Sequence, residues 1–120
     1  MRSGLGKFVW NDGSTYEGYW KENKMHGQGK YVWINGNIYE GEFSEDMKHG
    51  HGKFVWSNGD IYEGEYQDDK MNGHGKFVWN SGDIYEGDFK DNMKDGHGKK
   101  VYLDGKVEEG RWIHNYFVGE

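Results

Sequence analysis

Histidine is the residue type in this chain best suited to metal binding or proton transfer, and it recurs between two glycines. The position is held by His51, His74 and His97, with His49 close to the first of them. If the chain forms a sheet, equivalent residues two strands apart lie about 10 Å from one another, too far to share one metal ion. We therefore interpret these histidines as residues at the edges of turns and predict no metal site.

Carboxylates come in pairs, at Glu40/Glu42, Glu63/Glu65 and Glu86/Asp88. General acid–base catalysis needs two carboxylates in different environments within one pocket. These pairs instead repeat near lysines, which favours cross-strand charge pairing on a solvated face. The serines in turn positions have no positioned base, and the recurring glycine pairs precede strands, so neither predicts a nucleophile or a phosphate loop. We predict no catalytic residues, no cofactor and no enzymatic activity.

Lysines line the longer connections of the chain, at Lys24, Lys48, Lys70 and Lys94. They form the strip that a lipid-binding site would use, but aspartates and glutamates interrupt it. The net charge of -6 and the pI near 5.5 count against nucleic acid and against a general affinity for anionic lipid. The absence of cysteine excludes disulfides, and no apolar run is long enough to span a membrane. We expect a cytoplasmic protein, with association to the cytoskeleton or a membrane as the finer expectation.

A strict 23-residue period organises all of these residues. One domain, 1–120, therefore divides into units at about 4–26, 27–49, 50–72, 73–95 and 96–118, the last of them atypical. A unit of this length cannot bury its apolar face alone, so neighbouring units must stack into a one-dimensional array. Such arrays present surfaces instead of enclosing pockets, which favours a binding function.

Each unit reads as two strands joined by a tight turn. In the second unit, residues 30–33 and 38–43 are rich in aromatic and β-branched residues, and Asn35-Gly36 lies between them. A three-residue loop, 34–36, places Tyr31 opposite Tyr39 and puts the aromatic side chains on one face, with Gly36 in the left-handed position of a type I turn with a G1 bulge. The connection from Ser44 to His49 is expected to be a longer polar loop, whose third residue, Asp46, suits a left-handed backbone.

This pattern resembles the MORN repeat (membrane occupation and recognition nexus) along the whole chain. The resemblance rests on Tyr-Glu-Gly-x-aromatic, a polar turn and Gly-x-Gly. The corresponding aromatic and glycine positions are Tyr16, Gly18, Trp20, Tyr39, Gly41, Phe43, Tyr62, Gly64, Tyr66, Tyr85, Gly87 and Phe89. It implies an all-β repeat array of five stacked β-hairpins in one elongated, twisted antiparallel sheet. Ten strands would make that sheet about 50 Å long.

The glycines on the aromatic face leave a trough between large rings. Rings of adjacent repeats are expected to fill most of it, and a helix or extended segment of a partner protein to occupy the rest. Aromatic residues dominate binding hot spots, so the candidate partner-binding residues are those of the middle units: Tyr39, Phe43, Trp56, Tyr62, Tyr66 and Trp79.

The function predicted from these features is a non-catalytic protein-interaction scaffold. Proteins with this resemblance often organise cytoskeletal or membrane-associated assemblies, including those of cell division. Two alternatives stay open, a phosphoinositide-binding membrane tether and a regulatory repeat region cut from a larger enzyme.

The last unit departs from the pattern, with Lys100, Tyr102 and Glu108 at positions held by Phe, Trp and Tyr elsewhere. Its final strand, around 109–113, is expected to be unpaired, and an unpaired edge is a template for another chain. The self-association candidates are Trp112, Tyr116, Phe117 and Val118, which would form a homodimer or fold back as a cap on a monomer. Since the chain starts and stops within the same connection, we expect either a piece of a longer array or a small stand-alone protein.

Overall fold

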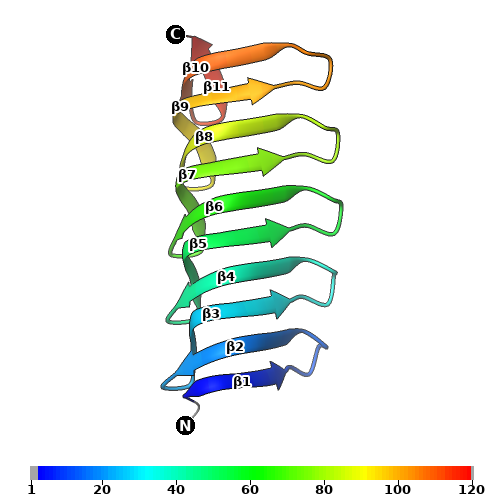
Figure 1. Ribbon diagram of the computed structural model, residues 1–120, viewed down its shortest axis with the longest axis vertical. Helices are drawn as coiled ribbons and strands as arrows, with labels where there is room; N and C mark the ends of the chain where they lie inside the picture. Colours follow the sequence, from blue (N-terminus) through cyan, green and yellow to red (C-terminus); the bar gives the residue numbers. More distant parts are fainter. Residues whose placement is uncertain (1–2, 120) are drawn as a thin grey trace.

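One antiparallel sheet makes up the whole of the computed structural model, which describes residues 3–119; Met1, Arg2 and Glu120 lie outside the described residues. Every strand pairs with its neighbours in sequence, so the order in space is the order in the chain (Figure 1). The array measures 52 × 23 × 17 Å, and the two ends of the chain lie at opposite ends of its long axis. The predicted all-β array of stacked hairpins is confirmed. None of the described residues belongs to a helix that could cross a membrane.

Residues 3–119 form eleven strands, where ten were expected for the chain. They are β1 (Gly4–Val9), β2 (Thr15–Lys21), β3 (Lys24–Val32), β4 (Ile38–Ser44), β5 (Met47–Val55), β6 (Ile61–Gln67), β7 (Lys70–Val78), β8 (Ile84–Lys90), β9 (Met93–Val101), β10 (Val107–Ile113) and β11 (Tyr116–Gly119).

The hairpin loops follow the register predicted from side-chain parity. Tyr31 lies opposite Tyr39. The Trp33 amide donates to the Asn37 carbonyl at 2.9 Å, which leaves a three-residue loop between them. Gly36 has a φ of 96° in that loop, a backbone conformation that glycine adopts without steric cost. The odd loop length therefore places the rings of both strands on one face.

The second connection differs from the expected polar loop. β4 continues to Ser44 and β5 begins at Met47, so only Glu45 and Asp46 lie between them. Both have positive φ, 49° and 70°, as a type I′ turn requires. The prediction was right for Asp46 but wrong for the loop length, because a strand pairs through its backbone and tolerates polar side chains on a solvated face.

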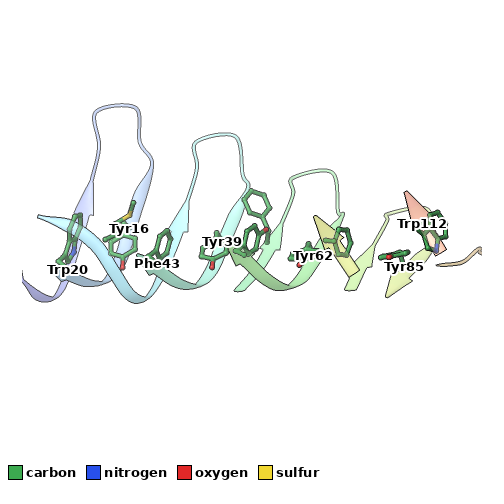
Figure 2. Close-up of a cluster of buried hydrophobic side chains, with 11 residues drawn as sticks. Tyr16, Trp20, Tyr39, Phe43, Tyr62, Tyr85 and Trp112 are labelled. Atoms are coloured by element: carbon green, nitrogen blue, oxygen red, sulfur yellow. The ribbon is translucent and has the colours of Figure 1, made fainter. Parts of the chain in front are cut away.

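A bulge follows each of these tight turns. Gly41 pairs with Gly52 and Phe43 with Lys48, so the single residue Glu42 faces three residues of β5. Gly50 absorbs the mismatch with a φ of 76°. The Glu42 side chain closes it, since its Oε2 accepts the backbone N–H of His51 at 2.6 Å. Bulges bend a sheet, and Figure 2 shows the ribbon curving around the labelled rings.

Neighbouring repeats are also joined at both sheet margins. At the tight turns, Asp69 donates its N–H to the Lys48 carbonyl at 3.0 Å and accepts the Lys48 N–H on Oδ1 at 2.7 Å. We call this two-bond contact the turn clasp. It recurs between Asp46 and Met25, Asn92 and Met71, and Asn115 and Lys94. At the hairpin loops, side-chain oxygens accept the next repeat's amides in the same way, as between Asp60 and Asn80 at 2.7 Å.

The C-terminal end corrects a second expectation. β10 is not the last strand, because β11 pairs with it through Phe117 opposite Trp112 and Tyr116 opposite Ile113. The type I′ turn at His114 and Asn115, with φ of 46° and 73°, reverses the chain for this pairing. The free edge therefore belongs to β11.

Candidate functional site

Aromatic side chains gather on one face of the sheet, which we call the ring face. They form two parallel rows. The inner row consists of Trp20, Tyr16, Phe43, Tyr39, Tyr66, Tyr62, Phe89, Tyr85 and Trp112. Figure 2 labels all of them except Tyr66 and Phe89. Successive rings meet edge to face, with centroids 5.0–5.4 Å apart and interplanar angles of 81–87°. This geometry is favourable for aromatic pairs, and every member of the row is buried. The inner row is the core of the protein.

The tyrosines of the inner row fill the trough that the glycines leave. A Cβ atom on Gly52 would collide with the Tyr39 ring, and a Cβ on Gly41 would collide with the backbone of Gly52. The Tyr39 hydroxyl donates to the Glu42 carbonyl at 2.8 Å. The same contacts recur at Tyr16, Tyr62 and Tyr85. Burial raises the pKa of Tyr16 to about 12. The trough therefore holds the chain's own rings, as expected for most of it.

The outer row lies beside the hairpin loops and is less buried. It consists of Phe8, Trp10, Tyr31, Trp33, Phe54, Trp56, Phe77 and Trp79. From Trp10 onwards the rings are tilted by 35–42°, with centroids 4.4–5.2 Å apart. All but Phe54 remain partly exposed. At its N-terminal end, a hollow of about 340 Å³ is lined by Trp10 of the outer row, Trp20 of the inner row and Met25, among other residues.

The six predicted partner-binding residues divide between the two rows. Tyr39, Phe43, Tyr62 and Tyr66 are at most 5% exposed in the inner row, so they form the core and offer little surface. Trp56 and Trp79 belong to the outer row and keep accessible ring area. Alternation along a strand identifies the face of a residue but not its depth, which is why the sequence alone did not separate these two groups.

The four predicted lipid-binding lysines do not form one strip. Lys48 and Lys94 point onto the ring face, where each ammonium lies within 6.0 Å of three or more ring centroids. Lys24 and Lys70 are exposed. They are one residue out of phase with the other two, so they face the opposite side of the sheet. Lys48 and Lys94 occupy the repeat position that Met25 and Met71 hold in other units. This alternation is visible in the sequence and would have separated these two lysines from Lys24 and Lys70.

Lys100 is a ring-face residue that the prediction omitted from its sites. It stands where the other repeats carry Phe or Tyr, and its Nζ lies 4.6 Å from the centroids of both Trp79 and Tyr102. The outer row of rings thus ends in a cation. The departure of the last unit from the repeat was the available signal.

The opposite face of the sheet is charged. Lysine and glutamate alternate across ten strands in one register, through Lys7, Glu17, Lys30, Glu40, Lys53, Glu63, Lys76, Glu86, Lys99 and Glu109. His51 and His74 lie beside this ladder, with Nε2 at 3.8 Å from carboxylates of Glu63 and Glu86. Within residues 3–119, no three His, Asp or Glu side chains are grouped so that they could hold a metal ion.

The four self-association candidates also divide. Trp112 is 2% exposed, and its Nε1 donates to the Gly98 carbonyl at 3.1 Å. Phe117 packs on Trp112 with ring centroids 5.2 Å apart. Tyr116 and Val118 are 75% and 55% exposed. Self-association stays a prediction, and these two residues with the edge of β11 are what it now rests on.

The comparisons with known proteins identify one family. The model of the MORN repeat matches the chain five times, at residues 1–15, 16–38, 39–61, 62–84 and 85–107. No curated protein matches the sequence. Among solved structures, selenomethionine-substituted virginiamycin B lyase from Staphylococcus aureus is similar at 14% identity and a TM-score of 0.28, over 94% of this chain and 43% of that one. The chain therefore spans less than half the length of that structure, and a likeness this weak carries no argument.

Proposed function

This chain belongs to the MORN-repeat family, and on that premise we propose that it is a scaffold that binds a segment of a partner protein along the outer row. MORN repeats are generally repeats for interaction with proteins or membranes, and the family is in general not enzymatic. The finer proposal is a cytoplasmic scaffold of cytoskeletal or membrane-associated assemblies.

The observation that supports this proposal is the exposure of the outer row. Its rings are held rigidly by stacking on one another, yet Trp33, Trp56 and Trp79 keep accessible area. Large, preorganised aromatic side chains lose little entropy on binding and supply most of the energy at protein interfaces. A helix or extended segment lying along the row would cover these rings together.

Binding to a display library of random twelve-residue peptides tests the proposal. Substitution of both Trp56 and Trp79 by Ala should weaken the selected peptides by at least about tenfold, the effect of losing aromatic hot spots. Tyr19→Ala is the matched control, because Tyr19 is 50% exposed and lies on the charged face between Gly18 and Trp20 of β2.

Affinities are compared at equal folded fraction, measured by thermal unfolding of each variant. Equal affinity of the wild type and the double tryptophan variant would refute the outer row as the binding surface. Vesicles of phosphatidylcholine with phosphatidylinositol 4,5-bisphosphate form a parallel arm. Salt-dependent vesicle binding without peptide binding would replace the scaffold by the membrane tether.

A further inference from the structure

Lys48, Lys94 and Lys100 lie over rings of the ring face, and their surroundings differ in charge. Lys48 is compensated: its Nζ lies 3.4 Å from Oδ1 of Asp69, the residue that also forms its turn clasp. The Lys48 side chain is only 17% exposed and lies over rings of both rows. A partly buried cation with a carboxylate neighbour needs no further partner.

Lys94 lacks that compensation. Its turn clasp is made by Asn115, whose Oδ1 accepts the Lys94 amide at 2.8 Å and carries no charge. The ammonium lies 5.3 Å from the Trp79 ring and 5.5 Å from the Trp112 ring. This repeat position holds an aspartate at Asp46 and Asp69, but it holds a neutral amide at Asn115.

Lys100 adds a second cation at the same place. Both ammonium groups lie over Trp79, at 5.3 Å for Lys94 and 4.6 Å for Lys100. Burial, and after it the charge of Lys100, lowers the pKa of Lys94. Among residues 3–119, ion pairs within 4.0 Å involve Lys48 and Lys106 but neither of these two lysines.

Glu108 is the acidic residue placed to compensate them, since it lies opposite Lys100 in the register of β9 and β10. Its carboxylate is used elsewhere. One oxygen accepts the hydroxyl of Tyr102, and the other lies 4.0 Å from the ammonium of Lys106. The C-terminal end of the ring face therefore keeps an uncompensated, partly desolvated positive charge.

An anion bound here would regain the interaction that the lysines lack, because opposite charge offsets desolvation most where solvent is partly excluded. The rings of the outer row continue directly from Lys100 towards the N-terminal end, so the same ligand would contact apolar surface beside its charge. Both requirements describe a protein segment with acidic and apolar side chains. A bilayer fits them less well, because a broad anionic surface would also extend over Asp91 and Asp95 near these turns, whereas a narrow segment along the outer row contacts the ring face alone.

We propose that Lys94 and Lys100 form an anion-binding site that receives a carboxylate side chain of an acidic protein segment lying along the outer row. The site rests on the proposed function, since the same segment covers the tryptophans. It also gives the partner a direction, with its acidic part at the C-terminal end of the array.

The test compares the wild type with a variant that carries Lys94→Met and Lys100→Phe. Both substitutions restore residues that the chain itself uses at these repeat positions, Met71 and Phe77, so the fold is retained. Asn115→Asp is a second variant, which places beside Lys94 the carboxylate that Lys48 already has in Asp69. The control is Lys48→Met with Asp69→Asn, which removes a compensated pair.

Random twelve-residue peptides are selected on the wild type, and each selected peptide is remade with Asp and Glu replaced by Asn and Gln. We expect acidic peptides, with at least about tenfold weaker binding after the amide replacement, as for the loss of a partly buried charge pair. The Lys94→Met, Lys100→Phe variant should bind acidic and amide peptides equally. Asn115→Asp should lower the preference for acid, and the Lys48 control should leave it unchanged.

The possible failures are distinguishable. In one outcome, selected peptides lose affinity in the Trp56 and Trp79 variant and yet bind equally well after Asp and Glu are replaced by Asn and Gln. That result overturns the anion site and leaves the proposed function standing. If no peptide distinguishes wild type from the tryptophan variant, both are refuted. Vesicles containing phosphatidylinositol 4,5-bisphosphate that bind through Lys94 and Lys100, with no acidic peptide selected, would overturn the protein partner and assign the site to lipid.

Discussion

The inner and outer rows share one face of one sheet and the same residue types, but they differ in depth. The inner rings meet at 81–87° and are buried, while most outer rings lean on one another at 35–42° and keep exposed area. The difference comes from glycine. Tyr39 and its equivalents lie directly over paired glycines, where no side chain lifts the ring from the backbone. The same repeat therefore supplies a core and a separate surface.

At alkaline pH we expect the buried tyrosines of the inner row to ionise. Because they form the core, the whole fold should unfold with them. Burial raises the pKa of Tyr16 and Tyr85 to about 12, above the ordinary 10.0. Because the folded pKa is the higher one, this stabilisation is fully present below pH 10 and is lost as the pH rises from 10 through about 12. Phenolate absorbance and circular dichroism, recorded together, should change in one cooperative step.

Tyr102 provides the control for this titration. Its pKa is also raised to about 12, but chiefly by its hydrogen bond to the Glu108 carboxylate. Glu108→Gln should lower the pKa of Tyr102 and leave the cooperative step in place. Ionisation of the inner tyrosines well before unfolding would contradict their role as core.

Truncation of one ring in each row compares the two directly. Tyr62→Ala should cost about 3–5 kcal/mol of unfolding free energy, since it opens a cavity in the core. Trp56→Ala removes a partly exposed ring and should cost less, roughly 1–2 kcal/mol, while it weakens peptide binding more. Denaturant unfolding measures both. Equal costs would mean that the two rows contribute equally to stability and that the outer row is core as well.

A methyl group placed under a tyrosine tests the role of glycine. Gly52→Ala should destabilise by up to about 3 kcal/mol, because its Cβ would overlap the Tyr39 ring. Gly6→Ala is the matched control at the same repeat position, where the nearest atoms belong to Trp20 at 3.5 Å. Similar losses at the two positions would remove glycine as the cause of the difference in depth.

Breaking one turn clasp should have the smallest effect. Asp69→Ala removes an acceptor and puts alanine at a φ of 70°, for roughly 1–2 kcal/mol in all. Asp69→Asn should cost less, because Asn92 makes the same clasp with Met71 and only the ion pair with Lys48 is lost. A large loss in the asparagine variant would mean that the ion pair with Lys48, not the clasp, stabilises this junction.

The sequence predicted the strand register because parity left one consistent solution. Only an odd loop at 34–36 puts Tyr31 and Tyr39 on the same face, and the structure has that pairing. The tight turns were harder to predict. The segment 47–50 has the composition of a loop, since polar residues and a glycine dominate it. It nevertheless belongs to β5, and Gly50 adopts the positive φ that the bulge requires.

The candidate site was predicted only as a face. Tyr39 and Trp56 have the same apolar pattern in sequence, and their different depths follow from contacts with neighbouring repeats. Lys100 and Asn115 became informative through their surroundings, when Lys94 was compared with the compensated Lys48. Whether a lysine is compensated depends on which side chains of neighbouring repeats lie beside it. The 23-residue period alone does not predict those contacts.

The turn clasps bear on how the array would respond to mechanical tension. Its two ends lie at opposite ends of the long axis (Figure 1), so a pull between them acts across the strands. The force then acts along the hydrogen bonds between strands, so these bonds break one after another instead of being loaded together in shear. Each clasp ties a turn only to the repeat before it, and so adds a small, local resistance at each junction. Stretching should therefore peel hairpins from the ends in successive steps, and a partner lying across several repeats would make the array harder to extend.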